Sequence, residues 1–288
     1  MNEKGSISTE ILIVLVVILL IIGIAAKFSE TTLDKIAIST ENENIELLLS
    51  QSVDSLINNV GNENWEKYIF GTPGLAILNE NEAIIPNSIS YEKFLILGDN
   101  YKKLVDKNIF NSKIKTSMEI IPQESSISSV KIGSQENTKN VYSVNRMVKC
   151  DFYKKYVIKD FQTKGKCNHN HGDDYSCNYF KVYRSYLRNN DYYLLIDKNS
   201  TDNLKWSMDT TRVKLPAVES VTSNKIYLNN RINLEFPITD LSSIIFIHFN
   251  KKDVKAVLVG VPKDFDKSKL DYDYFRTNNC EFILKGWY

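Results

Sequence analysis

The chain has 288 residues, of which 43% are hydrophobic and 11% aromatic, so it is long enough to bury a substantial core in one or two domains. Its 36 basic and 35 acidic residues leave a formal net charge of +1, with no basic stripe and no acidic tail. This balance argues against nucleic acid as a partner.

The first thirty residues carry the strongest signal in the chain. An apolar run over Ile11–Ala26 follows ten mostly polar residues. As a helix this run rises about 24 Å, and continuing it through Lys27, whose ammonium can reach the headgroups, gives a workable membrane segment over 11–28. Glu10 stands directly before the run. Because an unpaired carboxylate in hydrocarbon costs several kcal/mol, its position predicts a partner charge.

Three arrangements of this N-terminus fit the sequence. In the first, the apolar segment is an uncleaved signal anchor. In the second, it is a conventional secretory signal cut near the small residues at 23–26, although the leader has few positive charges and Glu10 borders its apolar part. In the third, cleavage after Gly5 makes Ser6 the new N-terminus, and the mature chain keeps the apolar helix.

The third arrangement resembles the class III signal peptide of archaeal type IV pilin-like proteins. Lys4, Gly5, Ser8 and Glu10 match the K-G-Q-x-S-x-E form of that motif. Ser6 departs from it at the position where Gln is usual. The resemblance implies a leader of residues 1–5, cleavage by a prepilin-type peptidase, and assembly with other pilin-like subunits. In a filament, the ammonium of a neighbour's Ser6 would pair with a buried Glu10 and fix the register.

Helical periodicity continues beyond the membrane segment, with apolar residues at spacings of three and four up to Val60, and Gly61 suits a C-terminal stop. These features predict one helix over 6–60, apolar in its first half and amphipathic in its second. The region 61–112 is predicted as a helix-and-loop connector. Its G-x-x-x-W segment, P-G-L-A-like turn and two short helices follow an order that resembles archaeal proteins with the same leader.

The remaining residues, 113–288, alternate in the manner of strands and predict an extracytoplasmic β-rich domain. Strands are expected at 114–121, 141–148, 180–186, 192–197, 225–228, 244–249, 256–261 and 282–287, with the third and fourth forming a hairpin and 123–139 forming a loop. Because no βαβ alternation occurs, the sheets are expected to be mainly antiparallel, and the whole chain is predicted as α+β. The run 244–249 is apolar on both faces, which suits a central strand and places His248 in the core.

Four cysteines, an even number, predict two disulfide bonds in a domain outside the membrane. Three pairings are open. We favour Cys167–Cys177, which closes a short polar loop, and Cys150–Cys280, which joins an early strand to the last one.

The segment between Cys167 and Cys177 also contains His169, His171 and Asp173, side chains that can bind zinc or another divalent metal. Its spacing is not that of a zinc finger, and an oxidising compartment would convert the thiols to a disulfide. A structural loop without a cofactor is therefore the favoured interpretation. Asn199 begins an N-glycosylation sequon in an expected turn.

No nucleophile elbow, phosphate loop or acid pair is recognisable, so the chain is not expected to be an enzyme. Two functions remain. One is a pilin-like surface protein, a minor or tip subunit of a type IV pilus-like filament held by its N-terminal helix. The alternative is a membrane-anchored extracellular binding module that does not polymerise. Both predict a single-pass protein of the cell membrane with its C-terminal domain outside.

Overall fold

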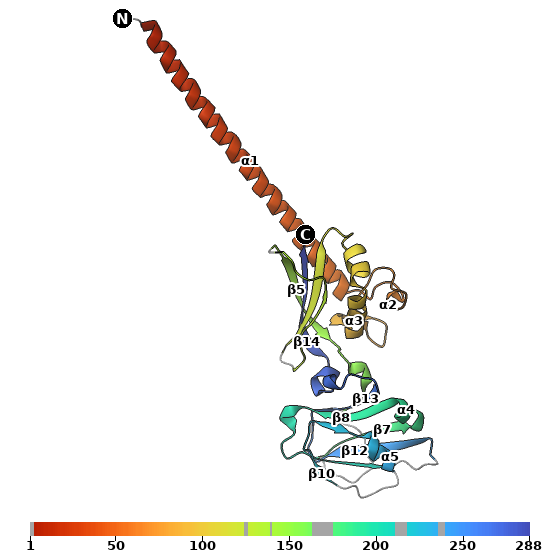
Figure 1. Cartoon of the computed structure of the whole chain (residues 1–288). Helices are drawn as coiled ribbons and strands as arrows, with labels where there is room; N and C mark the ends of the chain where they lie inside the picture. The colour runs from red at the N-terminus through yellow and green to blue at the C-terminus, as the bar shows by residue number, and fades with distance from the viewer. Residues whose placement is uncertain (1–2, 124–125, 139, 163–174, 211–217, 236–239) are drawn as a thin grey trace.

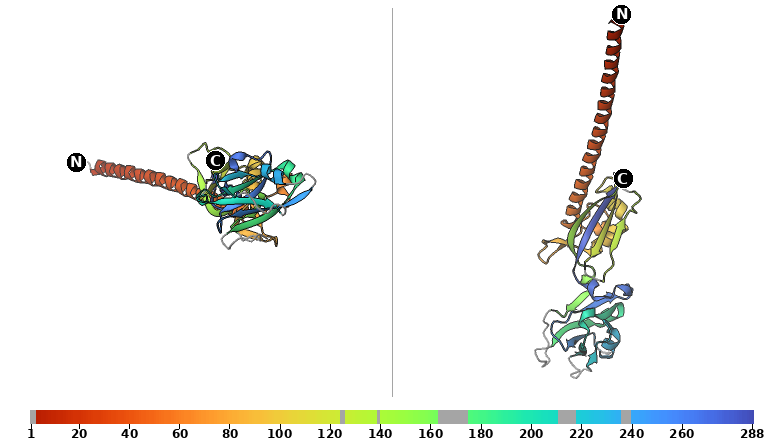
Figure 2. Two further views of the ribbon diagram at one scale, coloured as in Figure 1. Left: turned by 90° about the horizontal axis from the view of Figure 1, so that it is seen from below. Right: turned by 90° about the vertical axis from the view of Figure 1, so that its left-hand side faces the viewer.

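The computed structural model describes residues 3–123, 126–138, 140–162, 175–210, 218–235 and 240–288, without the side chains of residues 3–10, 32–42 and 235. Helix α1 (Glu3–Ile57) is one continuous rod whose N-terminal half stands clear of the rest of the chain (Figures 1 and 2). Two β bodies follow its C-terminal end. The predicted α+β class with mainly antiparallel sheets is confirmed, and the one parallel pair among the described strands is β2 with β5.

The body next to α1, which we call the proximal body, is built on a six-stranded sheet. Its strands, in spatial order, are β1 (Ala76–Leu78), β2 (Ile84–Ile89), β5 (Tyr142–Cys150), β14 (Asn278–Trp287), β3 (Lys115–Pro122) and β4 (Val130–Gly133). The end of α1, helix α3 (Tyr91–Asp99) and the π-helix η1 (Lys102–Lys107) share one apolar core with this sheet, and the short α2 (Trp65–Tyr68) follows α1.

The last three turns of α1 dock on the sheet through one stripe of side chains. Ile45, Leu49, Val53 and Leu56 follow the spacing of three to four residues that places side chains on one helix face, and all four are buried. Gly286 of β14 permits this approach, because a Cβ there would lie 3.0 Å from the Leu49 side chain. The amphipathic second half predicted for this helix therefore becomes a structural part of the proximal body.

The second body, residues 157–262, is a sandwich of two four-stranded antiparallel sheets, which we call the distal body. One sheet has the order β10 (Glu219–Ser220), β9 (Lys205–Thr210), β12 (Ser242–Phe249), β7 (Ser176–Tyr183), and the other β11 (Lys225–Tyr227), β8 (Asn190–Ile196), β13 (Ala256–Pro262), β6 (Val157–Asp160). Helices α4 (Arg184–Asn189) and α5 (Asn229–Glu235) and the short 3₁₀ turn η3 (Lys198–Ser200) join its strands. Phe180, Leu194, Trp206 and Ile247 form part of the core between the sheets.

The distal body is an insertion between two neighbouring strands of the proximal sheet. The chain leaves after β5 through η2 (Lys154–Tyr156) and returns to β14 through η4 (Lys267–Lys269) and η5 (Tyr272–Phe275), although β5 and β14 are paired along their length. Strand β8 is buried on both faces: Leu194 packs inside the sandwich, and Leu195 packs with the core of the proximal body. The two bodies therefore share packed apolar contacts.

The structure differs from the sequence-based expectation in one connection. Strands β7 and β8 do not form the predicted hairpin, because they belong to different sheets. Helix α4 lies between them, and its Leu187 is buried in the sandwich core. The predicted central position of the 244–249 strand is confirmed, since β12 lies between β9 and β7.

Candidate functional site

The most prominent surface of the molecule is the N-terminal half of α1. The 21-residue span Ile11–Thr31 contains a window of 18 residues with a mean hydropathy of 3.2, and none of that window is buried within the chain. Apolar side chains face outward on every side of the helix, from Val16 at 46% exposure to Phe28 at 73%. A helix that is apolar all round needs an apolar environment on every side. This one is long and apolar enough to span a membrane.

The predicted cleavage and assembly residues lie at the start of the same helix. Gly5, Ser6 and Glu10 fall within the backbone range of α1, Glu3–Ile57, and their side chains lie outside the described part of the molecule. Helix α1 thus carries residues 3–5 of the predicted leader, the apolar segment and the docked amphipathic half in one element.

The C-terminal end of α1 is closed by the glycine- and tryptophan-containing segment noted in the sequence. The Trp65 ring is fully buried, and its Nε1–H donates to the carbonyl of Val60 at 3.1 Å. The backbone N–H of Leu75 donates to the Leu56 carbonyl at 2.8 Å. Because the last carbonyls of a helix have no partner within it, the bond to Leu56 satisfies one of them at the end of α1, and the bond to Val60 fixes the turn that follows. The motif therefore has a structural role in mounting the helix on the proximal body.

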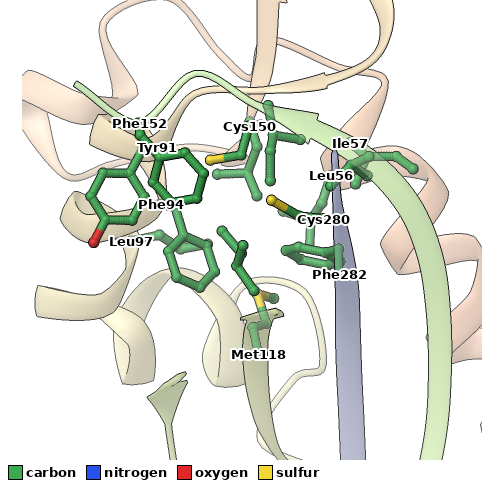
Figure 3. Close-up of a cluster of buried hydrophobic side chains, with 14 of the residues drawn as sticks. Leu56, Ile57, Tyr91, Phe94, Leu97, Met118, Cys150, Phe152, Cys280 and Phe282 are labelled. Atoms are coloured by element: carbon green, nitrogen blue, oxygen red, sulfur yellow. The ribbon is translucent and has the colours of Figure 1, made fainter. Parts of the chain in front are cut away.

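The two predicted disulfide bonds are not supported by the structure. Cys150 and Cys280 are thiols, fully buried in the core of the proximal body, with their sulfur atoms on neighbouring strands (Figure 3). Asn278, not Cys280, lies directly opposite Cys150 in the register, so the two thiols meet diagonally and share a side-chain hydrogen bond. Burial raises the pKa of the Cys150 thiol. The other expected pair involves Cys167, which lies outside the described residues.

The metal-site prediction cannot be placed on the structure, because His169, His171 and Asp173 lie outside the described residues. Within the described ranges, no three His, Cys, Asp or Glu side chains surround one point. Asn199, the predicted glycosylation residue, lies exposed in η3, and its backbone N–H donates to the Asp197 carboxylate at 2.7 Å.

A buried polar chain that the sequence did not reveal lies on the sheet β10-β9-β12-β7 of the distal body. His248 is 1% exposed, as its position in an apolar strand predicts, and both ring nitrogens have polar neighbours. Nδ1 lies 3.1 Å from the Cys177 Sγ, and Nε2 lies 3.1 Å from an oxygen of Asp209. The alternation of polar and apolar residues along each strand could not predict that these three side chains lie together. Their proximity depends on the register between β7, β12 and β9.

A hollow of about 700 Å³ lies in the proximal body, between η1 and the β3–β4 edge of the sheet, and Lys102, Lys115 and Asp106 contribute to its lining. In its wall the Tyr101 hydroxyl lies 2.9 Å from Thr116 Oγ1, which donates to Asp106 at 3.0 Å. Burial raises the pKa of Asp106. These bonds hold the π-helix against β3, so the polar chain acts as a structural support.

Comparison with protein-family models, curated proteins and solved structures finds no match to this chain.

Proposed function

We propose that this chain is a pilin-like surface protein, held in the cell membrane by α1 and taken into a type IV pilus-like filament as a minor or tip subunit. The observation that carries the proposal is the fully exposed apolar half of α1, which continues without a break into the half that is docked in the proximal body. Lipid would cover the apolar half before assembly, and helices of neighbouring subunits would cover it afterwards.

The position of the outer bodies supports this proposal. From Thr31 to Ile45, the first buried residue among the described side chains of the docked half, the helix rises about 21 Å, which would hold the proximal body away from the membrane surface. The distal body lies farther along, at the end of the molecule opposite the N-terminus (Figure 1). A bulky two-part head at that end suits a subunit of low abundance or at a tip.

The first experiment is to determine the N-terminus of the protein recovered from its native membrane by mass spectrometry. A chain that begins at Ser6 is expected. A chain that begins at Met1 would leave an uncleaved anchor and remove the pilin-type processing from the proposal. A start near Lys27 would mean that the apolar segment is discarded, and the filament role would be ruled out.

A second experiment separates a filament subunit from a tethered binding module. Glu10→Gln removes the charge that a neighbour's N-terminal ammonium would pair with, so the variant should stay in the membrane, with its outer bodies folded, and be missing from sheared surface filaments. Glu30→Gln, the same change at the other end of the apolar segment, is the matched control and should assemble normally. Equal incorporation of both variants would favour the anchored module that does not polymerise.

We also propose that Cys150 and Cys280 become linked once the domain is outside the membrane. Each thiol would lose one proton and one electron to a thiol oxidant of that compartment, such as another disulfide, and an S–S bond would form between β5 and β14. Peptide mapping of the native protein without reduction should then recover the two cysteines in one linked peptide, lighter by two hydrogen atoms. Recovery of both as alkylated thiols would contradict this pairing.

A further inference from the structure

A row of exposed aromatic and basic side chains lies on the outer face of the sheet β10-β9-β12-β7. Phe180 and Val182 of β7 point into the sandwich core. Because side chains alternate along a strand, Tyr179, Lys181 and Tyr183 point outward. The two tyrosines are 43% and 41% exposed, and Lys181 is also exposed. A ligand outside the molecule can therefore reach three successive outward side chains of one strand.

Neighbouring elements widen this row into a larger surface. Ile244 of β12 is paired with Lys181 in the register and is exposed. Tyr186 of α4 is 56% exposed and meets Tyr183 edge to face, with ring centroids 5.6 Å apart. Apolar and aromatic side chains that gather on one surface, instead of scattering singly, mark an interaction site. We call this surface the tyrosine patch; it consists of Lys159, Tyr179, Lys181, Tyr183, Tyr186 and Ile244.

Two ammonium groups give the tyrosine patch a positive charge. Lys159 Nζ lies 5.3 Å from the centre of the Tyr179 ring, and Lys181 Nζ lies 5.0 Å from the centre of the Tyr183 ring. Such cation–π contacts hold an ammonium group in place without neutralising it. Within the part of the chain that the structure describes, neither lysine forms an ion pair with a carboxylate. Both charges remain available to an anionic ligand.

The tyrosine patch faces away from the proximal body. Leu195 of β8 and Val257 and Val259 of β13 pack with the proximal core, so their sheet lies next to that body. The outer face of the other sheet, which carries the patch, is on the opposite side of the sandwich. Strands β7 and β12 and helix α4 lie at the end of the molecule opposite the N-terminus (Figure 1). A partner outside the cell could therefore approach the patch without meeting the proximal body.

We propose that the tyrosine patch binds an acidic polysaccharide whose charges are widely spaced. The exposed tyrosine rings would cover the C–H faces of sugar rings, and their hydroxyl groups would bond to sugar hydroxyls. The Lys159 and Lys181 ammonium groups would donate to carboxylates of the polymer. The inference rests on the proposed function only for placing the distal body outside the membrane, and it holds equally for a filament subunit and for a tethered module.

The spacing of the two charges favours such a polysaccharide over nucleic acid. Tyr179 and Tyr183 are four residues apart on one strand, so the ammonium groups over their rings repeat at about 13 Å. Double-stranded DNA carries one negative charge per about 1.7 Å, and a single strand one per about 3.4 Å. A polysaccharide with a carboxylate on only some of its sugars matches the wider spacing. Extended peptides bind at a sheet edge or in a groove, whereas this patch is the face of a sheet.

The test measures binding of the full chain, in a mild uncharged detergent, to immobilised polysaccharides by biolayer interferometry. The acidic probes are hyaluronan, which has a carboxylate on every second sugar, and carboxymethyl-cellulose of low substitution. Uncharged hydroxyethyl-cellulose is the neutral probe. We expect binding to both acidic polymers and not to the neutral one. Tyr183→Ala and Lys181→Gln should each lose about tenfold in affinity.

Matched controls come from a second tyrosine–lysine pair in the proximal body, where Lys67 Nζ lies 5.6 Å from the centre of the exposed Tyr68 ring. Tyr68→Ala and Lys67→Gln should bind as the unchanged chain does. Thermal unfolding of each variant checks its fold, and Tyr186→Ala, in α4, replaces Tyr183→Ala if that variant does not fold.

Three results would each overturn the proposal. The unchanged chain could bind neither acidic polymer. The patch variants could bind as well as the Tyr68 and Lys67 controls, which would place the binding elsewhere on the chain. Double-stranded DNA or polyglutamate could bind more tightly than both acidic polysaccharides, which would assign the patch to another class of partner. Because the purified chain is used, none of these results depends on whether the protein enters a filament.

Discussion

At the scale of single residues, the turn after α1 depends on two glycines whose neighbours leave no room for a Cβ. Gly61 has a φ of 83°, and a Cβ on it would lie 2.5 Å from the Trp65 ring. A Cβ on Gly74 would lie 2.2 Å from the carbonyl oxygen of Asn59, which is backbone and cannot turn aside. The close approach of the turn to the helix end is therefore fixed by these two positions.

We expect Gly74→Ala to lower the free energy of unfolding of the proximal body by about 1–3 kcal/mol, because the added methyl group must push two backbone segments apart. Gly23→Ala is the matched control, since a Cβ there meets nothing within 4 Å. Urea unfolding followed by tryptophan fluorescence measures both, because Trp65 and Trp287 are buried in this body. Equal midpoints for the two variants would show that the turn can relax without cost.

Reasoning from single residues came close where a local rule applied, and it failed where the pairing of strands determined which residues meet. A local rule predicted a helix stop at Gly61, and its φ of 83° is indeed left-handed, but α1 already ends at Ile57, four residues earlier. The meeting of Cys177, His248 and Asp209 joins residues up to 71 positions apart, and it requires knowing which strands are neighbours. Strand order suggested that Cys150 and Cys280 lie close together, but the sequence could not reveal that the two thiols meet diagonally.

At the scale of elements, α1 is attached to the sheet both by apolar packing and by a charged contact. Leu49 is fully buried against the sheet. Arg146 of β5 donates to the Asp54 carboxylate at 2.9 Å, but these two side chains are 36% and 50% exposed. Exposed ion pairs contribute little to the free energy of unfolding, because water and salt screen them. Burial of the leucine stripe should therefore dominate the attachment.

We expect Leu49→Ala to destabilise the proximal body by about 2–5 kcal/mol and Arg146→Ala by less than about 1 kcal/mol. Leu47→Ala, on the exposed side of the same helix at 57% exposure, should change stability by less than about 0.5 kcal/mol. Denaturant unfolding of the three variants gives this ranking directly. A larger loss for Arg146→Ala than for Leu49→Ala would mean that the ion pair, not the apolar stripe, holds the helix.

The elements that were predicted are those with long, regular patterns. The helix over 6–60 corresponds to α1, and the expected strand at 141–148 corresponds to β5. Strand β2 was missed because Pro86 and the positive φ of Asn87 interrupt it, and most of its side chains are exposed. Strand β4 has four residues within a polar stretch, so neither length nor alternation could mark it. Short edge strands form because a neighbouring strand of the sheet pairs with them. A local sequence pattern does not show which strand that neighbour is.

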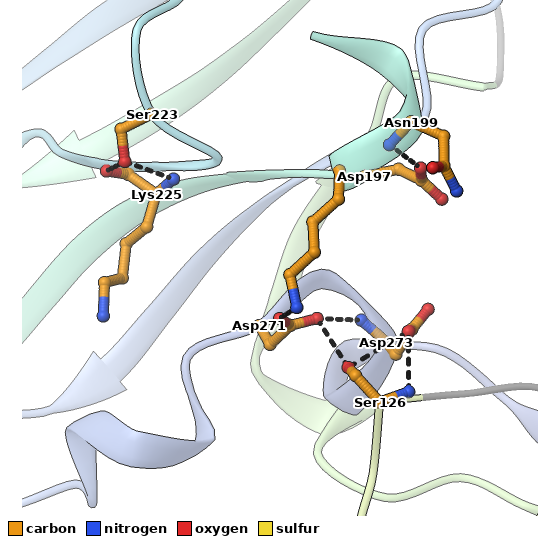
Figure 4. Close-up of polar contacts among 8 residues, drawn as sticks. Ser126, Asp197, Asn199, Ser223, Lys225, Asp271 and Asp273 are labelled. Atoms are coloured by element: carbon orange, nitrogen blue, oxygen red, sulfur yellow. Dashed lines mark hydrogen bonds and ion pairs between the residues drawn. The ribbon is translucent and has the colours of Figure 1, made fainter.

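At the scale of the whole molecule, the two bodies are joined by the linking segment between β13 and β14. Asp271 in this segment contacts both of them (Figure 4). Its carboxylate accepts from Lys198 of the distal body at 2.9 Å and from Ser126, in the loop before β4 of the proximal body, at 3.2 Å. The unbroken β8 run, buried on both faces, adds apolar contact to the same junction. The distal body is thus held against the proximal body by apolar packing and by the Asp271 carboxylate.

The ionisation of Asp271 should make the junction dependent on pH. Burial acts to raise the pKa of Asp271, but the bonds from Lys198 and from the Asp273 backbone outweigh burial and hold this pKa below its usual range. A carboxyl group whose pKa is lower in the folded state stabilises that state above its ordinary pKa of about 3.9, and the contribution disappears as the pH falls through the lower folded value.

We therefore expect Asp271→Asn to speed amide hydrogen exchange at the junction at pH 7. The free energy of opening should fall by less than about 1 kcal/mol, because Lys198 is 61% exposed. Below the folded pKa the unchanged chain also carries a neutral group, so the difference in opening free energy should vanish. Lys198→Met should reproduce part of the effect at pH 7 and add less when combined with Asp271→Asn, as coupled partners do. A difference of the same size on both sides of the titration would mean that the Asp271 side chain acts through its shape and hydrogen bonds, and that its charge does not fasten the two bodies.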